Sequence, residues 1–218
     1  MTRESSSTHN QEENFKLMRK LFMAALFIAC TAPFTFAQTG DDYNKYDVGV
    51  LYSHNRVDTG VEDPNQNFLS EREGFHGFEA FVKGNVSRYV GLKGSYSFNR
   101  KSFNTGGGTA ATTFDVDTDI HQFLGGVEFK DNAKETKVKP FAHVLAGVAH
   151  ARAKVSNSTI PFNDSENENG FAAAVGGGID FKLGDRVDLR AVQFDYNPVR
   201  SNGETSHNFR IGIGLIFR

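Results

Sequence analysis

Apolar residues alternate with polar or small residues over most of the chain beyond residue 45. The end of the chain, HNFRIGIGLIFR, places an apolar side chain at every second position from Phe209 to Phe217, with Arg210 and two glycines between them. A period of two predicts a β-strand with one apolar face and one small or charged face. The same pattern predicts eight strands, over residues 46–53, 75–83, 90–99, 121–130, 138–149, 171–182, 187–196 and 209–217.

The connections between these strands alternate in length. In chain order they contain about 21, six, about 21, seven, about 21, four and 12 residues, and the longer ones are rich in Gly, Asn, Ser and Asp. The segment GVEFK at 126–130 returns as GIDFK at 178–182, which makes the β-hairpin the repeating unit. Short turns at one end and long loops at the other are typical of outer-membrane barrels. The pattern predicts an all-β fold, an eight-stranded antiparallel up-and-down transmembrane β-barrel with periplasmic turns and extracellular loops.

The two faces of the predicted strands differ in charge. One face carries apolar rows, which include Phe78, Ala80, Val82, Leu92, Tyr96, Phe98, Phe123, Val127, Phe129, Phe171, Val175, Ile179 and Phe181. The opposite face carries Asp47, Glu79, Lys93, Gln122, Glu128, Lys139, Asp180, Asp188, Arg190 and Arg210. A charge that faces lipid near the bilayer midplane costs roughly 2–4 kcal/mol, so we expect the charged face to point into the barrel.

Buried ions need partners, and the predicted hairpins supply them. Counting back from each short turn brings an acidic residue on one strand near a basic residue on the next: Glu79 near Lys93, Glu128 near Lys139, and Asp180 near Arg190. Eight strands enclose a lumen just wide enough for side chains. These residues and Arg210 therefore predict an ion-pair ladder that fills the lumen. The alternative is an open sheet whose charged row faces solvent.

Two of the predicted strands interrupt the alternation. In the fifth strand three residues fall on the inward face: Phe141, His143 and Leu145. In the seventh strand the phase slips between Ala191 and Phe194. A β-bulge at that point would return Phe194 and Tyr196 to the outer face.

The N-terminal region has the layout of a secretory signal peptide. A basic start precedes an apolar run over residues 21–30, and TFA at 35–37 places small residues at the two positions that a signal peptidase recognises. The run is shorter than the about 20 residues that a membrane-spanning helix needs. Alternatives are a buried core helix or a lipoprotein modified at Cys30. The expected division is a signal peptide over 1–37 with translation starting at Met18, a short lead over 38–44 and an outer-membrane barrel over 45–218.

Composition and charge exclude several classes of protein. The predicted signal contains four of the 24 Lys and Arg residues and three of the 26 Asp and Glu residues, which leaves 181 residues with a formal charge of −3. That charge offers no basic field to nucleic acid. The one cysteine, Cys30, lies in the predicted signal, so the mature chain has no disulfide framework and no thiolate metal site. We expect one domain and no cofactor.

The C-terminal strand resembles the targeting strand of bacterial outer-membrane barrels. Its polar, glycine, apolar and aromatic positions are occupied by Arg210, Gly212, Leu215 and Phe217. In that family the aromatic residue is usually last, whereas here Arg218 follows it. Together with the signal peptide, the strand count and the loop asymmetry, residues 44–218 resemble the small OmpA-like outer-membrane β-barrel family. No peptidoglycan-binding domain is expected, because the last predicted strand reaches the C-terminus.

The resemblance implies a monomer in the cell outer membrane, in contact with outer-membrane lipid and lipopolysaccharide. It also implies recognition by the barrel-assembly machinery through the C-terminal strand. The implied function is non-enzymatic: envelope structure, surface attachment or ligand contact through the extracellular loops. A lumen filled by side chains predicts no large aqueous pore.

Two other functions remain open. Some eight-stranded outer-membrane barrels are lipid hydrolases or acyltransferases with a Ser/His/acid set near the outer rim. The candidates here are Ser53 and Ser206 with His54, His76, His121, His143, His150 and His207, although no fixed spacing supports a triad. The other possibility is a soluble exported lipocalin-like ligand binder, which needs an apolar lumen and a polar exterior, the reverse of the predicted faces.

The segment DVDTD opens like a calcium-binding loop. It supplies Asp115, Asp117 and Asp119, but Ile120 stands at the sixth position in place of Gly, and Gly126 stands at the twelfth in place of Glu. The pattern therefore favours a solvated acidic loop. A divalent ion shared with lipopolysaccharide is the weaker alternative.

Overall fold

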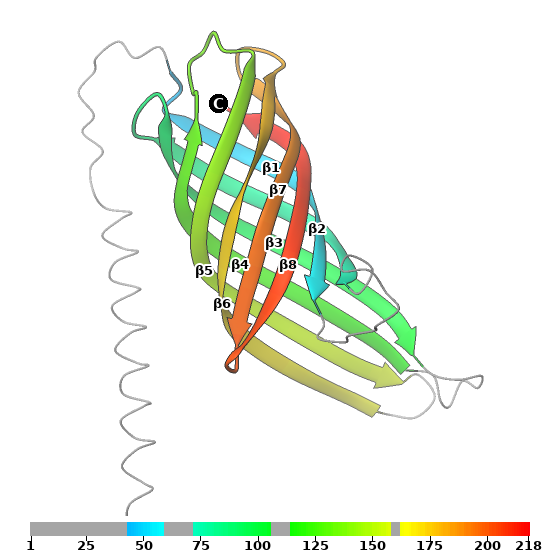
Figure 1. Ribbon diagram of the computed structural model, residues 1–218. Helices are drawn as coiled ribbons and strands as arrows, with labels where there is room; N and C mark the ends of the chain where they lie inside the picture. Colours follow the sequence, from blue (N-terminus) through cyan, green and yellow to red (C-terminus); the bar gives the residue numbers. More distant parts are fainter. Residues whose placement is uncertain (1–42, 59–71, 106–113, 158–161) are drawn as a thin grey trace, which may run out of the picture. The chain divides into compact units, whose positions relative to one another are not determined.

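The computed structural model describes residues 43–58, 72–105, 114–157 and 162–218. These residues form eight strands in one closed antiparallel barrel, in which each strand pairs with its neighbours in the chain and β8 closes onto β1 (Figure 1). The predicted fold class is confirmed. Most of the N-terminal lead and the whole predicted signal peptide lie outside the described residues. The strands are β1 Tyr46–Asp58, β2 Arg72–Asn85, β3 Val90–Thr105, β4 Phe114–Lys130, β5 Val138–Asn157, β6 Phe162–Lys182, β7 Val187–Ser201 and β8 Glu204–Phe217.

The strands reach further toward the loop end than the sequence pattern predicts. β5 and β6 contain 20 and 21 residues and stay paired as far as Asn157 and Phe162. About 9–11 tilted residues suffice to cross a bilayer, so this hairpin extends well beyond the apolar section. Strand pairing needs no apolar alternation where both faces of a hairpin meet water. Segments that look like loops in the sequence therefore continue as strand.

The β7–β8 connection is a tight turn, although the sequence pattern predicts 12 residues there. Asn202 and Gly203 join the two strands and have φ angles of 49° and 90°. Positive φ at both central residues is what a type I′ hairpin turn requires, and Asn-Gly is its favoured dipeptide. The loop end of the barrel is therefore uneven, with a long β5–β6 hairpin and a short β7–β8 turn (Figure 1).

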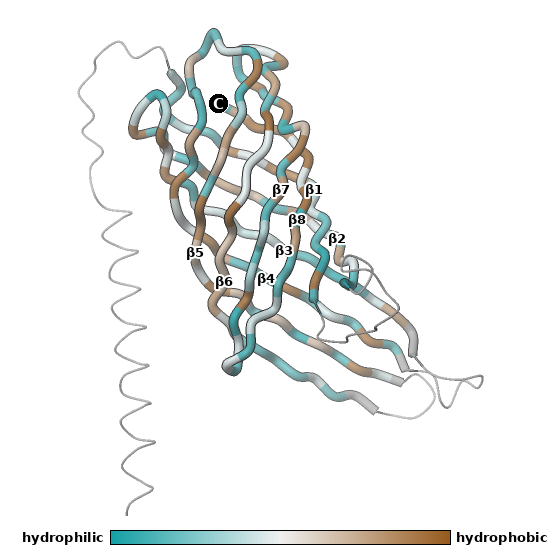
Figure 2. Tube along the Cα trace, viewed as in Figure 1, coloured by the Kyte–Doolittle hydropathy of each residue, from teal (hydrophilic) through white to brown (hydrophobic). Residues whose placement is uncertain are grey.

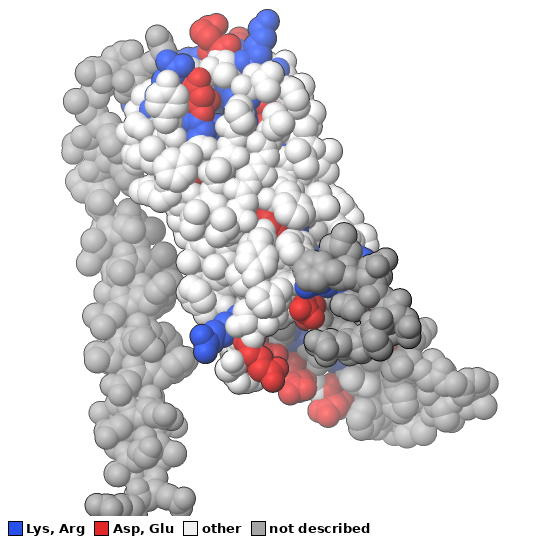
Figure 3. Space-filling model, viewed as in Figure 1, with Lys and Arg blue, Asp and Glu red and all other residues white. Residues whose placement is uncertain are grey.

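The barrel is polar inside and apolar outside, as the alternation predicts. Val82, Phe123 and Phe171 on the outer face are 62, 57 and 59 % exposed, whereas Glu128 and Arg190 on the inner face are fully buried. Figure 2 shows hydrophobic and hydrophilic residues alternating along the strands, and Figure 3 shows an almost uncharged band between two charged ends. Within the described residues, no helix is long and apolar enough to cross a membrane. The polar lumen is the opposite of what a lipocalin-type barrel needs.

The predicted bulge lies in β7. The register between β6 and β7 shifts beside Ala191, which has no partner on β6. Because this extra residue changes the phase, Phe194 lies on the outer face while Gln193 and Asp195 point into the lumen. The three exceptional residues of the fifth strand also lie inside, as predicted: Phe141, His143 and Leu145.

Gly178 on β6 makes room for an aromatic ring inside the barrel. A Cβ at this position would lie 1.9 Å from the Val192 carbonyl oxygen and 2.9 Å from the Phe141 ring. That ring covers the guanidinium group of Arg190, whose Cζ lies 3.7 Å from the ring centroid. A small residue is therefore required here, because the backbone and the ring already fill the space.

Candidate functional site

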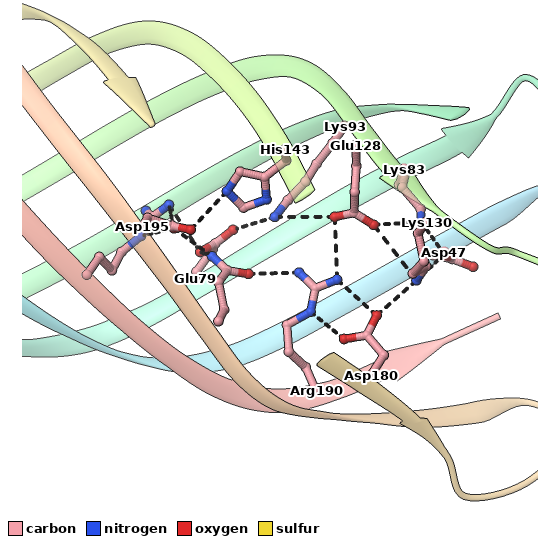
Figure 4. A network of polar contacts seen from close by, with 12 residues as sticks. Asp47, Glu79, Lys83, Lys93, Glu128, Lys130, His143, Asp180, Arg190 and Asp195 are labelled. Carbon is pink, nitrogen blue, oxygen red and sulfur yellow. Dashed lines mark hydrogen bonds and ion pairs between the residues drawn. The ribbon is translucent and has the colours of Figure 1, made fainter. Parts of the chain in front are cut away.

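A network of buried polar side chains fills the turn-end half of the lumen (Figure 4). All eight strands contribute to it, and none of its members exposes more than 3 % of its surface. We call this set the lumen network. It consists of Asp47, Glu79, Lys83, Lys93, Glu128, Lys130, Lys139, His143, Asp180, Asp188, Arg190, Gln193, Asp195 and Arg210.

Glu128 on β4 is the centre of the network in Figure 4. Its Oε1 lies 2.8 Å from the Nζ of Lys83 on β2, and its Oε2 lies 3.4 Å from Arg190 on β7. The neighbouring Lys130 places its Nζ 3.0 Å from the Oδ2 of Asp180 on β6. These contacts run across the lumen, so opposite walls of the barrel are joined by ion pairs.

Gln193 connects this cluster to a second one. Its Oε1 accepts a hydrogen bond of 2.7 Å from Arg190, and its Nε2 donates to Glu79 at 2.9 Å and to Asp195 at 2.8 Å. Arg210 on β8 lies 2.7 Å from Asp195 and 3.4 Å from Glu79. A neutral amide thus donates to two carboxylates and accepts from one guanidinium without adding charge.

The structure brings two of the expected pairs together. Lys93 Nζ lies 3.0 Å from Glu79 Oε1, and Arg190 Nε lies 2.8 Å from Asp180 Oδ1. In both cases the two strands are joined by a short turn, so counting back along the hairpin places the residues near each other.

The expected contact between Glu128 and Lys139 is replaced by other partners. Glu128 pairs in register with His143, because the seven-residue turn 131–137 leaves the start of β5 extending past the end of β4. Lys139 Nζ therefore lies 3.3 Å from Asp188 on β7 instead. The estimate from the sequence assumed a symmetric hairpin, and this turn is not symmetric.

Three other basic residues, which the sequence analysis did not assign to the lumen, also reach into it. Lys83 and Lys130 fall on the inward phase of β2 and β4, so the alternation would have found them. Arg218 could not have been found in this way, because it lies beyond the last strand. Its guanidinium group contacts the Asp188 carboxylate, while its backbone N–H donates to the Arg186 carbonyl at 3.0 Å. The residue after the terminal aromatic position thus contacts Asp188, a member of the lumen network.

The residues of the C-terminal pattern divide between the two faces of β8. Arg210 and Gly212 point inward, and Gly212 lies opposite Ser53 of β1. Leu215 and Phe217 point outward and are 40 and 49 % exposed. The pattern therefore combines one member of the lumen network with two residues of the apolar band.

Asp131 stabilises the turn between β4 and β5 through hydrogen bonds. Its carboxylate accepts hydrogen bonds from Arg88 at 2.9 and 3.0 Å, from Thr136 Oγ1 at 2.9 Å and from the Ala133 N–H at 3.2 Å. These donors, Arg88 first, lower the pKa of Asp131 to about 2. The turn end of the barrel is thus held by a charged group outside the membrane-spanning strands as well as by the network within.

The loop-end half of the lumen contains a cavity of about 370 Å³, which we call the loop-end cavity. Its walls are small or uncharged side chains together with a few carboxylates, in contrast to the packed ions of the turn-end half. Residues that line it include Asn55, Gln122, Ala149, Ala151, Glu168 and Glu204.

A ring of histidines lies on the outer surface near the loop end. Its members are His54, His76, His121, His150 and His207. Three of them are hydrogen-bonded to a tyrosine, in the pairs Tyr52–His76, Tyr96–His121 and Tyr196–His207. Four arginines also point outward, one on every second strand, and each lies two residues closer to the loops than the level of the histidine ring. They are Arg56, Arg100, Arg152 and Arg200. We call these histidines and arginines the outer rim.

The candidate catalytic serines and histidines are not brought together. Ser53 is fully buried in the lumen, where Asn99 Nδ2 donates to its Oγ at 3.2 Å, whereas His54 points outward. Ser206 donates to the Asp58 carbonyl at 2.8 Å. His143 lies inside the lumen network, 2.9 Å from Asp195. Within the part of the chain that the structure describes, no serine hydroxyl is bonded to any of the six histidines.

The acidic segment at the start of β4 is strand rather than loop. Asp117 and Asp119 lie 3.1 and 3.5 Å from Arg100 on β3, and Ser102 donates a hydrogen bond to Asp117. Among the described residues, no group of three or more His, Cys, Asp and Glu residues is placed to hold a metal ion. These carboxylates are therefore engaged with a neighbouring strand.

Comparisons with known proteins support the same architecture. A family model described as outer membrane protein beta-barrel domain matches residues 22–217. A search of curated proteins gave no match. Among solved structures, Ail, the attachment invasion locus protein of Yersinia pestis, in complex with the heparin analogue sucrose octasulfate, is 19 % identical with a TM-score of 0.55, over 79 % of this chain and 97 % of that chain. Neisserial surface protein A is 11 % identical with a TM-score of 0.50, over 80 % and 97 %.

Proposed function

Because this chain belongs to the outer membrane protein β-barrel domain family, and is therefore an outer-membrane barrel, we propose that it is a non-enzymatic surface protein with a closed lumen. The barrel holds its loop-end hairpins at the cell surface, where they contact a ligand or another surface. It also contributes to the structure of the envelope.

The lumen network is the observation that carries this proposal. A solute crossing the barrel would have to separate buried ion pairs that join opposite walls, such as Arg190 with Glu128. Removing one partner from a buried pair costs about 3–5 kcal/mol, because the other charge is left without compensation. The turn-end half is therefore a plug made of the barrel's own side chains.

The long β5–β6 hairpin supports contact outside the membrane. Its strands remain paired beyond the outer rim, from Ala153 and Glu166 to the ends at Asn157 and Phe162. Ail is named an attachment invasion locus protein and was solved with a heparin analogue. An identity of 19 % supports a shared barrel, so the ligand of this chain has to be found by experiment.

The outer rim supports contact with the phosphate groups of lipopolysaccharide. Guanidinium groups bind phosphate with two parallel hydrogen bonds, and Arg152 and Arg200 are exposed on the outer face near the loop end. An apolar band on all eight strands suits a monomer surrounded by lipid. The outward Leu215 and Phe217 of β8 suit recognition of this strand by the barrel-assembly machinery.

A non-enzymatic role is supported by the separation of the candidate serines from the histidines. We expect the purified barrel to leave the acyl chains of phospholipid and lipid A unchanged, as measured by mass spectrometry after prolonged incubation. Released or transferred acyl chains, absent with heat-unfolded protein, would instead favour a lipid-modifying enzyme.

Planar-bilayer recording tests the closed lumen. We expect the refolded mature chain to give no stable current of porin size. A matched control is Glu128→Gln, which weakens the network without shortening the side chain. Stable large currents from the unaltered barrel would disprove the plug.

Surface display tests the loop-end contact. Cells that display the barrel are compared, on arrays of glycans and matrix proteins, with cells that display a variant lacking residues 154–165 at the tip of the β5–β6 hairpin. Lys154 and Ser165 are partners in register, so the shortened strands can be joined by a two-residue turn. Binding that is lost in the shortened variant supports the proposal. Binding unaffected by the deletion, or no binding by the full barrel, contradicts it.

A further inference from the structure

We propose that the loop-end cavity is a binding site for a small organic cation, an amine or guanidine attached to a short apolar body. The cavity measures about 370 Å³, which lies in the range of small-molecule sites. This site is separate from the hairpin tip and does not depend on loop-mediated attachment.

Two buried acceptor oxygens in the cavity wall lack donors. Asn55 and Gln122 are 1 and 2 % exposed, both line the cavity, and neither Asn55 Oδ1 nor Gln122 Oε1 has a hydrogen-bond partner among the described residues. Buried polar atoms are nearly always hydrogen-bonded, so such oxygens mark a place for a donor. A ligand carrying N–H groups supplies that donor.

The orientation of Gln122 follows from its own hydrogen bonds. Asn197 Nδ2 donates to the Ala173 carbonyl at 2.7 Å, which leaves Asn197 Oδ1 as the acceptor. Gln122 Nε2 donates to that oxygen at 2.8 Å. Exchanging the oxygen and nitrogen of the Gln122 amide would place its oxygen against Asn197 Oδ1, and both atoms are acceptors. Gln122 Oε1 is therefore the atom left for a ligand.

The charge of the cavity favours a cation. Glu168 and Glu204 line it, and so does Asp58, which pairs with Arg72 at 3.6 Å. Among the described residues that line the cavity, none is Lys, Arg or His. In the lumen network, by contrast, carboxylates lie against lysine and arginine groups. Figure 3 shows acidic side chains gathered at the loop end of the barrel.

The remaining walls suit a short apolar body. Val57, Ile120, Ala151 and Val199 line the cavity beside the polar groups. Ala149, which also lines the cavity, belongs to a cluster of buried apolar side chains with Leu124, Leu145, Ala172 and Ala174. The cavity therefore has an apolar part of its wall beside the polar groups, and a ligand enters and leaves at the loop end.

Calorimetric titration of the full mature barrel in lipid nanodiscs tests this proposal, with empty nanodiscs as the blank. The probes are 2-phenylethylammonium, the neutral 2-phenylethanol and the anionic phenylacetate, which share one apolar body. We expect saturable one-to-one binding of the ammonium probe and at least tenfold weaker binding of the other two. Smaller discrimination, tighter binding of phenylacetate, or no saturable binding of the ammonium probe would overturn the proposal.

Substitutions locate the binding in the cavity. The double variant Glu168→Gln with Glu204→Gln should weaken ammonium binding at least tenfold, whereas Glu166→Gln, on the same strand but outside the cavity lining, should change it less than twofold. Ala151→Trp should abolish binding by filling the cavity without changing charge. The mobility of unboiled samples on a gel verifies that each variant is folded. Unchanged affinity in the double variant or in Ala151→Trp would place the probe elsewhere and overturn the assignment.

Discussion

The two halves of the lumen are built from the same eight strands but filled in opposite ways. In the turn-end half the inward positions carry long ionic side chains that meet at the axis, as Arg190 and Glu128 do. In the loop-end half they carry short ones such as Ala149 and Ala151, and a cavity is left. Alternation along a strand decides which side chains point inward. The length and charge of those side chains decide whether the lumen is closed or open.

The largest difference between the halves should appear when one carboxylate in each is neutralised. Glu128→Gln removes a carboxylate that Lys83 and Arg190 share in a buried site and leaves each with one fewer counter-ion, so we expect the free energy of unfolding to fall by about 3–5 kcal/mol. Glu204→Gln at the exposed loop end should change it by less than about 0.5 kcal/mol. Because the chain contains no Trp, urea unfolding is followed by gel mobility and circular dichroism. Similar losses in both variants would show that the halves are equally ionic.

Adding volume should distinguish packed lumen from cavity. Ala172 is fully buried in the apolar cluster, so Ala172→Leu should destabilise the barrel by about 1–3 kcal/mol through overpacking. Ala151 lines the cavity, where Ala151→Leu should cost less than about 0.5 kcal/mol. The same unfolding measurement compares the pair. An equal cost at both positions would mean that the cavity is filled.

The smallest effect should come from the surface of the turn end. Asp131 has a pKa of about 2 in the folded barrel against an ordinary value of 3.8. A lowered folded-state pKa means that its stabilisation is fully present above about pH 4 and is lost as the pH falls toward 2. Asp131→Asn should therefore cost less than about 1 kcal/mol at pH 7, and the difference from the unaltered chain should shrink by pH 2.

Thermal melts of the unaltered chain and the variant at pH 7, 4 and 2 measure this effect. Glu135→Gln, in the same exposed turn, is the matched control. A difference that stays constant over this pH range would rule out the Asp131 carboxylate as its source.

The architecture and the direction of each face follow from sequence because they depend on a local period of two. The bulge at Ala191 was predictable for the same reason, since it appears as a slip in that period. The lengths of the loop-end connections were not predictable, because polar strands outside the membrane carry no apolar alternation. One signal was present but unused: Asn202-Gly203 is the favoured dipeptide of a two-residue hairpin turn.

The contacts within the lumen were predictable only between neighbouring strands. Glu79 with Lys93 follows from counting along one hairpin. Lys83 on β2 with Glu128 on β4 does not, because it depends on side-chain length and on which residues share a level of the closed barrel. The loop-end cavity could not be predicted from the sequence either, because it is defined by space that short side chains leave empty.

The ion pairs across the lumen also constrain how the barrel assembles. Arg190 on β7 meets Glu128 on β4 only once the sheet has curled into a cylinder. A partly inserted flat sheet would turn its charged row toward hydrocarbon, at roughly 2–4 kcal/mol for each Lys or Arg near the midplane and less for each Asp or Glu. Insertion and closure should therefore proceed as one concerted event, with the charged row kept hydrated until the final seam between β8 and β1 forms.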